Sequence, residues 1–562
     1  MKKKVLPVVA AIILILILAA IAIVSKVVDK YIPTDERADV KEYYGITLDG
    51  EIPVILQDEV ASEMSIMVDG IPYLNYDMVK TYLNNRFYWD VEEKLMFYTT
   101  PTEVIKIPAG GAEYSVSGEG ESYDHIIVRT EGDSAYIAID FVKQYTNFTF
   151  QILQDPDRVL VTYKWETVKQ SKAKRDESVR VQGGVKSPIL TDIQKGDTVT
   201  VLEQMENWTK VVTKDGYIGY VRNNKLGDVY EETLSNDFTE PEYTRIQRDY
   251  KINLVWHQIS NMDSNYNLAS DIASMTGVNV ISPTWFSVVS KDGTVSSLAE
   301  SGYVTTAHEK GLEVWGLVDN FNQEVDMKAV LTTTAAREKL IDQLIQAALD
   351  YDLDGLNIDF ENLPQELGDA YIQFLRELSV QCRKNQLVLS TDNTVPRDFS
   401  AYYQRSQQAE VVDYFIIMGY DEHYVGSEPG SVASLSFEKE GIELTMAEGV
   451  PADKIISGVP FYTRLWKTDT NGEVSSEAIG MNTAEQTLED NGVTSNWSEE
   501  TSQDYAEYYD PDGNFYQIWL ENENSLEMKA KLVQEYDLAG IAAWKLGFEK
   551  SGIWEILSGN IR

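Results

Sequence analysis

The sequence predicts a multidomain protein with an α/β barrel at its C-terminal end, preceded by a small all-β barrel, an α+β repeat domain and an N-terminal transmembrane helix. Three observations support this fold class. Apolar, strand-like runs alternate with helical patterns over residues 249–562, which is typical of an eight-stranded (β/α)8, or TIM, barrel. A segment within residues 34–165 repeats itself, and a long uncharged run lies before residue 34.

Composition and charge exclude several classes of function. The chain has 562 residues, of which 90 are acidic and 48 are basic, giving a net charge of −42. Phosphate backbones would repel such a surface, so we expect no nucleic-acid partner. The single cysteine, Cys382, lies in an amphipathic run and is expected to be buried rather than nucleophilic. The four histidines are far apart, and we expect neither a metal site nor a cofactor.

The N-terminal end has the pattern of a membrane anchor. Lys2, Lys3 and Lys4 precede the run from Val5 to Ser25, which contains no charged residue. A bilayer core requires about 20 apolar residues, so residues 1–33 are predicted to be a cytoplasmic tip followed by a single membrane span. A long signal peptide is the alternative. Both interpretations export the remainder, and the near absence of cysteine suits a protein of the bacterial cell membrane with its catalytic part outside the cytoplasm.

Residues 34–165 contain an internal repeat. The segment from Tyr73 to Tyr82 aligns with the segment from Tyr136 to Tyr145. Each copy follows a turn signal and ends in strand-like runs, which predicts two β-β-α-β units. This region resembles the copper amine oxidase N-terminal-like domain of exported bacterial proteins. Copper is not implied, because the region holds one histidine, His125. A spacer or protein-contact role is expected.

A compact β module is predicted between two linkers. Residues 166–177 are polar and basic, and residues 231–248 are acidic, so both are predicted to be linkers. Between them, residues 178–230 contain short strand-like runs separated by glycine-containing turns. These runs resemble a bacterial SH3 domain, a module often carried by cell-wall enzymes. The expected strands are Val179–Val181, Asp197–Leu202, Trp208–Thr213 and Tyr217–Val221.

The barrel is expected to place its chemistry at the carboxyl ends of its strands. The eight expected strands are Ile252–Trp256, Val278–Ser282, Leu312–Val318, Gly355–Asp359, Leu387–Thr391, Val412–Met418, Lys454–Gly458 and Ala539–Trp544. The fourth is the most informative. Side chains alternate across a strand, so Asn357, Asp359 and Glu361 are expected inside the barrel and the apolar residues between them against the helices. Burying unpaired carboxylates costs several kcal/mol each, which favours a catalytic use.

Several segments of the barrel resemble glycoside hydrolase family 18. The run from Asp354 to Glu361 is similar to the family signature Asp-x-x-Asp-x-Asp-x-Glu, with asparagine at position 357. The run from Met418 to Asp421 resembles the Met-x-Tyr-Asp element, and Trp544 matches the tryptophan beneath the reactive sugar. After the seventh strand, a long insertion contains an expected hairpin, Asp504–Tyr509 and Phe515–Leu520, at the place where the family often walls its sugar groove.

The resemblance implies a substrate-assisted retaining mechanism, in which the substrate's own 2-acetamido group is the nucleophile. By this resemblance, Glu361 is the general acid, Asp359 holds the acetamide N–H and Tyr420 hydrogen-bonds the acetamide oxygen. The surroundings of Phe360 and Trp544 are expected to raise the pKa of Glu361 by desolvation. The implied substrate-binding residues are Asn357, Asp421, Trp544, Met418 and Asp354.

Asn357 is the main departure from the family pattern. An asparagine amide can only donate a hydrogen bond to Asp359 or accept one from it, so Asp359 is expected to ionise more readily. We therefore expect an active enzyme with an altered acidic limb, and comparing pH–rate profiles of the native protein and Asn357→Asp tests this. The run from Asn357 to Asn362 also resembles the spore-cortex-lytic branch of the family, which tolerates asparagine at this position.

The sequence as a whole favours a membrane-anchored, outward-facing hydrolase of β-1,4 bonds next to N-acetylglucosamine in peptidoglycan. Three alternatives stay open. The first is a chitinase or an endo-N-acetylglucosaminidase acting on other N-acetylglucosamine polymers. The second is a glycan-binding protein without hydrolytic activity. The third is a structural protein that contacts cell-wall or divisome partners through residues 34–230.

Overall fold

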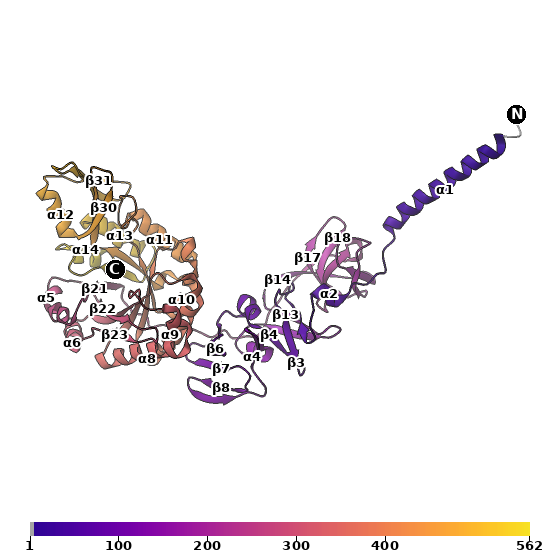
Figure 1. Ribbon diagram of the computed structural model, residues 1–562, viewed down its shortest axis with the longest axis horizontal. Helices are drawn as coiled ribbons and strands as arrows, with labels where there is room; N and C mark the ends of the chain where they lie inside the picture. Colours follow the sequence, from indigo (N-terminus) through magenta and orange to yellow (C-terminus); the bar gives the residue numbers. More distant parts are fainter. Residues whose placement is uncertain (1–4, 562) are drawn as a thin grey trace. The chain divides into compact units, whose positions relative to one another are not determined.

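The computed structural model describes residues 5–561 and divides into two compact units (Figure 1). One unit comprises residues 1–98 and 106–240, and the other comprises residues 99–105 and 241–562. The first helix, α1, spans Val5–Tyr31. No helix within residues 5–561 is both long and apolar enough to cross a bilayer, so the predicted transmembrane span is not found there. Lys2, Lys3 and Lys4, expected in the cytoplasm, lie outside the described residues.

The internal repeat is present, and each copy has one strand more than predicted. Two strands, a short helix and two further strands follow one another in both copies. The equivalent strands β4 and β11 pair antiparallel, with Leu74 opposite Ile137, so the two copies meet through matching edges. The elements are α2 (Val40–Tyr44), β1 (Glu51–Ile52), β2 (Val54–Ile55), β3 (Ser65–Val68), β4 (Ile71–Asn75), α3 (Tyr76–Met78), β5 (Phe87–Asp90), β6 (Leu95–Thr99), β7 (Val104–Pro108), β8 (Glu113–Val116), β9 (Glu119–Ser122), β10 (Val128–Glu131), β11 (Ser134–Ala138), α4 (Ile139–Gln144), β12 (Thr149–Leu153) and β13 (Arg158–Thr162).

The β module forms one sheet in the order β16-β15-β19-β18-β17-β14-β20, around a core of small apolar side chains. Its strands are β14 (Thr167–Lys172), β15 (Glu177–Arg180), β16 (Ile189–Ile193), β17 (Thr198–Gln204), β18 (Trp208–Val212), β19 (Ile218–Arg222) and β20 (Tyr230–Thr233). The prediction of a linker over residues 166–177 is wrong, because β14 pairs with both β17 and β20. Its polar composition concealed a strand in which Ser171 is buried and donates to Gly227 O at 3.1 Å. The second predicted linker likewise begins inside β20.

The repeat domain and the β module share a hydrophobic cluster within their unit. Tyr44 of the repeat domain packs with Tyr217 and Ile218 of the β module. The Arg158 guanidinium donates to Asp215 O at 2.9 Å, and Tyr43 donates its hydroxyl to Ile218 O at 2.7 Å. These contacts join the two modules into one body.

The barrel is closed by eight parallel strands within residues 252–544. Strand β21 pairs with both β22 and β34, and the remaining strands lie between them in chain order, as predicted. Apolar side chains from these strands, including Trp256 and Trp315, fill the interior. The strands are β21 (Ile252–His257), β22 (Val280–Val288), β24 (Glu313–Asp319), β25 (Gly355–Asp359), β26 (Val388–Thr394), β27 (Tyr414–Met418), β28 (Ile455–Pro460) and β34 (Gly540–Trp544), with β23 (Val295–Ser297) as a hairpin extension of β22.

Helices lie outside the ring of strands (Figure 1). They are α5 (Leu268–Asp271), α6 (Ser301–Glu309), α7 (Met327–Thr332), α8 (Thr334–Tyr351), α9 (Gly368–Lys384), α10 (Arg405–Val411), α11 (Leu435–Ala447), α13 (Glu523–Glu535) and α14 (Ile553–Asn560). Cys382 lies on α9 and is fully buried, and burial raises the pKa of its thiol, so the expectation of an inert cysteine is confirmed.

The long insertion after β28 forms a sheet of its own, in the order β30-β29-β33-β32-β31. The predicted hairpin is confirmed as β32 and β33. The sheet and helix α12 enclose a separate apolar cluster that includes Ile518 and Leu488. The elements are β29 (Tyr462–Thr468), β30 (Val474–Gly480), α12 (Met481–Asp490), β31 (Asn496–Ser498), β32 (Gln503–Tyr509) and β33 (Phe515–Leu520).

Candidate active site

Most of the predicted site residues gather at the carboxyl ends of the barrel strands. Asp359 is the last residue of β25, and Glu361 follows it by two positions. Met418 ends β27, so Tyr420 and Asp421 begin the loop after it, and Trp544 ends β34. The barrel brings these ends together, because parallel strands that close into a barrel all finish at the same rim.

Asp354 does not belong to this group. It precedes β25 and therefore lies at the amino end of the strand, about 17 Å from Asp359 for five residues of extended chain. Its carboxylate oxygen Oδ2 accepts hydrogen bonds from Val314 N at 2.8 Å and lies 2.9 Å from His308 Nε2. The structure therefore separates Asp354 from the other predicted site residues, and its carboxylate ties the start of β25 to neighbouring elements.

Asn357 is fully buried and has all its hydrogen bonds inside the barrel. Its Oδ1 accepts from Trp256 Nε1 at 3.0 Å and from Ser282 Oγ at 3.1 Å. Its Nδ2 donates to Ser390 Oγ at 3.1 Å and to Asp392 Oδ1 at 2.7 Å. Both amide protons are therefore used, and the expected hydrogen bond with Asp359 is not found in the described chain. This buried amide also contacts no solvent, so it organises the interior of the site rather than binding substrate directly.

Asp359 is the buried carboxyl with the fewest partners at the site. It is 5% exposed, and among the described residues none hydrogen-bonds to its Oδ1. Burial raises the pKa of Asp359 well above its ordinary range, and the nearby charges of Asp392, Glu361 and Asp319 raise it further. An unpaired oxygen of this kind is available to accept a hydrogen bond from a ligand.

Glu361 is half-buried and is positioned through its backbone. Asn320 receives the Glu361 N–H on its Oδ1 and donates its Nδ2 to Glu361 O, both at 2.9 Å. Burial raises the pKa of Glu361, and the charge of Asp421 raises it further. A raised pKa favours the protonated form of the carboxyl, which can act as an acid. Phe360 does not contribute to this environment, because it faces outward and stacks on Phe374 at 5.5 Å between ring centroids.

Aromatic rings form one side of the site. The Trp256 ring lies 6.0 Å from that of Trp544 and 6.5 Å from that of Tyr420, centroid to centroid. Burial raises the pKa of Tyr420 well above its ordinary range, so its hydroxyl stays protonated and can donate. Tyr462, the first residue of β29, donates its hydroxyl to Asp421 Oδ1 at 2.6 Å.

Sequence reasoning missed four residues of the site: Asn320, Asp319, Asp392 and Tyr462. The first three share a signal in the sequence, because each is a polar residue within two positions after the predicted end of a barrel strand. Asp319 accepts from Ser287 Oγ at 2.8 Å, and burial raises its pKa. Tyr462 gave no signal of its own, since its contact with Asp421 depends on how the insertion folds.

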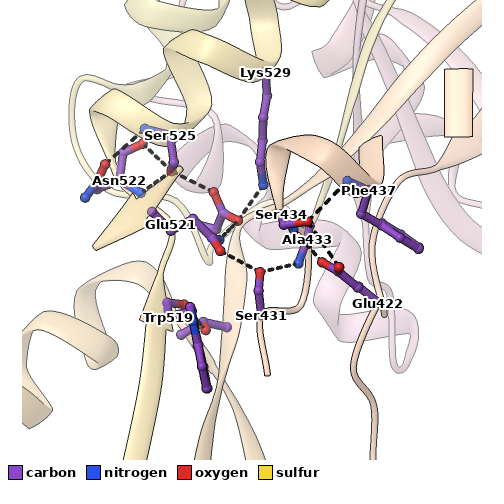
Figure 2. Close-up of polar contacts among 12 residues, drawn as sticks. Glu422, Ser431, Ala433, Ser434, Phe437, Trp519, Glu521, Asn522, Ser525 and Lys529 are labelled. Carbon is purple, nitrogen blue, oxygen red and sulfur yellow. Dashed lines mark hydrogen bonds and ion pairs between the residues drawn. The ribbon is translucent and has the colours of Figure 1, made fainter. Parts of the chain in front are cut away.

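A polar network fixes the loop after β27 against the insertion (Figure 2). In this loop, Ser434 caps α11 and holds both oxygens of Glu422, through its N–H at 2.8 Å and its Oγ at 3.1 Å. Ser431 donates to Gln503 Oε1 on β32. Gln503 Nε2 in turn donates to Glu521 Oε1 at 2.6 Å. The loop that begins with Tyr420 and Asp421 is thereby connected to the insertion.

Glu521 is the centre of this network (Figure 2). It forms an ion pair with Lys529 of α13 at 2.6 Å, and both side chains are 1% exposed. Ser525 Oγ donates to its other oxygen at 2.8 Å. Glu438 of α11 lies near enough to Lys529 and Glu521 for their charges to affect it. It is buried with neither oxygen hydrogen-bonded within residues 5–561, and burial raises its pKa to about 8. A methyl group added at Gly419 would meet Glu438 Cγ at 2.8 Å, so this neutral carboxyl packs directly beneath the start of the loop.

The site can donate a proton from the half-buried carboxyl of Glu361. This carboxyl lies near the unpaired Oδ1 of Asp359 and the aromatic rings of Trp256 and Trp544. Carboxyl groups with pKa values raised by burial serve the hydrolysis of glycosidic bonds, and barrels of this fold carry their chemistry at this rim. The fold and the site thus define the class of protein as a glycoside hydrolase.

Comparison with known proteins specifies the class. Residues 287–549 match the sequence model of glycosyl hydrolases family 18, and residues 178–226 match the bacterial SH3 domain. The protein is therefore a glycoside hydrolase with a family 18 catalytic domain and a bacterial SH3 domain. The resemblance of residues 34–165 to the copper amine oxidase N-terminal-like domain stays a prediction.

Relatives of the barrel occur in Bacillus. The chain is 26% identical over 296 residues to the uncharacterized glycosylase YvbX of Bacillus subtilis, covering 50% of this chain and 84% of that protein. It is 26% identical over 239 residues to the cortical fragment-lytic enzyme of Bacillus subtilis, covering 41% and 55% of the two chains. The crystal structure of the Bacillus cereus spore cortex-lytic enzyme SleL shares the fold, with a TM-score of 0.51 at 21% identity, covering 59% of this chain and 78% of that one.

Proposed function

We propose that this protein cleaves β-1,4 bonds next to N-acetylglucosamine in bacterial peptidoglycan, outside the cytoplasm. The observation that carries the proposal is the pair formed by Glu361, whose burial favours the protonated acid, and Asp359, whose Oδ1 lacks a partner among the described residues. Similarity to a cortical fragment-lytic enzyme and the presence of an SH3 domain support a cell-wall substrate.

In the proposed reaction, Glu361 donates its proton to the bridging oxygen and later accepts a proton from the attacking water. The carbonyl oxygen of the substrate's 2-acetamido group attacks the anomeric carbon, so the product retains its configuration. Asp359 accepts the acetamide N–H through its unpaired oxygen. Tyr420, which stays protonated, donates to the acetamide oxygen and so orients it toward the anomeric carbon.

The remaining residues bind the sugar in this proposal. Trp544 provides an apolar floor for the ring, and Trp256 supports it from the barrel interior. Asp421 contacts a sugar hydroxyl, with its orientation fixed by the hydrogen bond from Tyr462. Met418 is 9% exposed and lines the base of the site.

The direct test uses purified peptidoglycan and the full chain, with Glu361→Gln as its matched variant. Released fragments are reduced and analysed by mass spectrometry. We expect fragments ending in reducing N-acetylglucosamine from the native protein, and a rate lower by about 10²–10⁴-fold from the variant, because an amide cannot donate the proton. Fragments ending in reducing N-acetylmuramic acid, or equal rates from the two proteins, would contradict the proposal.

A chitinase or endo-N-acetylglucosaminidase activity is the second candidate. The proposed roles of Asp359 and Tyr420 require only an acetamido group, which chitin also carries. Parallel digestion of chitin oligomers separates the two substrates: release from chitin alone favours this candidate. Sedimentation of the protein with the wall without any release of fragments would favour a glycan-binding function.

The cellular location belongs to the proposal as well. Residues 34–230 are proposed to contact the wall or other envelope proteins, and anchoring by residues 1–33 stays a prediction from the sequence. Fractionation of cells producing the chain with and without residues 1–33 tests both location and anchoring. Recovery of the full chain in the cytoplasmic fraction would contradict an extracytoplasmic role.

A further inference from the structure

Asp392 lies beside Asp359 on the neighbouring strand. In the parallel pair β25–β26, Asn357 is in register with Ser390 and Ile358 with Thr391, so the next position places Asp359 level with Asp392. Asn357 and Ser390 both face the interior, and residues two positions further along face the same way. Adjacent strands are about 4.8 Å apart, so the two carboxyls are neighbours.

The two carboxyls have unequal surroundings. Asp392 is 3% exposed, and its Oδ1 accepts from Asn357 Nδ2 at 2.7 Å. Burial raises the pKa of Asp392, while hydrogen bonding to Asn357 and Trp256 acts in the opposite direction. Asp359 has no such donor at Oδ1 among the described residues. The negative charge of the pair is therefore better accommodated on Asp392, and the proton on Asp359.

Other ionisable groups also face this pair. Glu361 and Asp319 add negative charge, which further favours keeping at least one proton on the pair. The tyrosines around it have pKa values raised by burial and stay neutral. These groups are Glu361, which follows β25, Asp319 of β24, Tyr420 in the loop after β27, Tyr371 of α9 and Tyr403 in the segment after β26.

We propose that Asp392 is a positioning residue that takes up the proton of Asp359 when Asp359 accepts the acetamide N–H of the substrate. The O–H bond on Asp359 breaks and an O–H bond on Asp392 forms, so no proton is exchanged with solvent. This rests on the proposed function, since it requires an acetamido substrate. Asp392 thus supplies, from the adjacent strand, a carboxyl partner that position 357 does not provide, and Asn357 holds it in place.

The test moves the carboxyl rather than only removing it. Asp392→Asn is expected to lower kcat by about 10²-fold with a small change in KM. Its acid limb should move to higher pH, because the native pair keeps Asp359 ionised down to the lower of its two steps, whereas in the variant Asp359 titrates alone, at a pH between those two steps. The double variant Asn357→Asp/Asp392→Asn restores a carboxyl on the same interior face and is expected to recover activity to within about tenfold of the native protein.

A structural role for Asp392 predicts different results. Loss of a packing contact would not be repaired by a carboxyl at position 357, and it would leave the acid limb unchanged in the active fraction. Ser390→Ala, which removes one hydrogen bond of Asn357 but no carboxyl, should retain the native pH profile. A double variant no more active than Asp392→Asn, with both folded by circular dichroism, would overturn the proposal.

Infrared titration of the protonated carboxyl band tests the pair without catalysis. In the native protein the coupled pair should titrate in two steps. In Asp392→Asn these two steps should be replaced by one step at a pH between them, because an isolated carboxyl titrates once whereas a coupled pair titrates twice. The same single step in both proteins would refute the pairing. If the native protein hydrolyses no glycan while the two steps are present, the proposed function fails and the coupling of Asp359 with Asp392 stands.

Discussion

At the scale of single residues, the position of the proposed acid, Glu361, is decided by a neighbour that sequence motifs do not include. Asn320 binds both the N–H and the carbonyl of Glu361 at 2.9 Å, which fixes the backbone just where β25 has ended. A catalytic group displaced by about 1 Å loses about 10²-fold in rate, even when its own chemistry is intact.

Asn320→Ala is therefore expected to lower kcat by about 10–10²-fold with little change in KM, because Glu361 loses its backbone support while the sugar-binding rings are untouched. Steady-state kinetics with the proposed glycan substrate measures this. Asn322→Ala is the matched control, since the Asn322 side chain accepts from Glu324 N within the same loop. Equal losses in the two variants would indicate a general effect on the loop.

At the scale of elements, the insertion and α13 are joined by a buried ion pair. Glu521 and Lys529 are each 1% exposed and 2.6 Å apart, so neither charge is stabilised by water. Breaking a buried pair leaves one uncompensated charge, which costs about 3–5 kcal/mol, whereas an exposed pair contributes about 0–1 kcal/mol.

Lys529→Met should accordingly lower the free energy of unfolding by about 3–5 kcal/mol, because Glu521 stays buried without a cation. Urea denaturation followed by tryptophan fluorescence measures it. Lys531→Met is the control, because Lys531 pairs with Glu527 on the exposed face of the same helix at 2.7 Å. A loss as small as that of the control would show that water reaches Glu521.

At the scale of the whole molecule, stability depends on carboxyl groups that fold in their protonated form. Burial raises the pKa of Glu438 to about 8, and the pKa values of Asp359 and Asp392 are raised by the same cause. A raised folded-state pKa means that the folded protein binds more protons than the unfolded chain between about pH 4.5 and pH 8, so stability falls as pH rises through this range. The net charge of −42 adds self-repulsion in the same direction.

We expect the urea midpoint to be higher at pH 5 than at pH 8.5, and the difference to shrink in Glu438→Gln, because an amide does not have to be protonated to be buried. Denaturation at the two pH values with constant salt measures this. The exposed variant Glu440→Gln should keep the native difference. A midpoint that rises with pH would show that the buried carboxyls do not dominate the stability of the protein.

The barrel was predictable because its strands are buried on both sides and alternate with helices. Strands buried on both sides consist of long apolar runs, which are visible in the sequence. The same reasoning located Asp359 and Glu361, since polar residues at the end of an apolar strand have few structural uses. It did not anticipate that Asp354 lies apart from the site, because the family signature was followed there although the expected strand Gly355–Asp359 leaves Asp354 at its amino end. It also failed for β14, whose polar side chains concealed a strand held by pairing on both edges.

The sequence by itself determined the eight strands, the insertion hairpin, the repeat and the candidate acid Glu361 with its neighbouring aspartate, because these depend on local periodicity and on residue type. The tertiary structure alone decided that Asn357 binds Asp392 rather than Asp359, that Asn320 supports Glu361, and that Tyr462 orients Asp421. Each of these contacts joins different strands or loops. These contacts depend on the register of neighbouring strands and on the closure of the barrel, and neither can be inferred from a single segment of the chain.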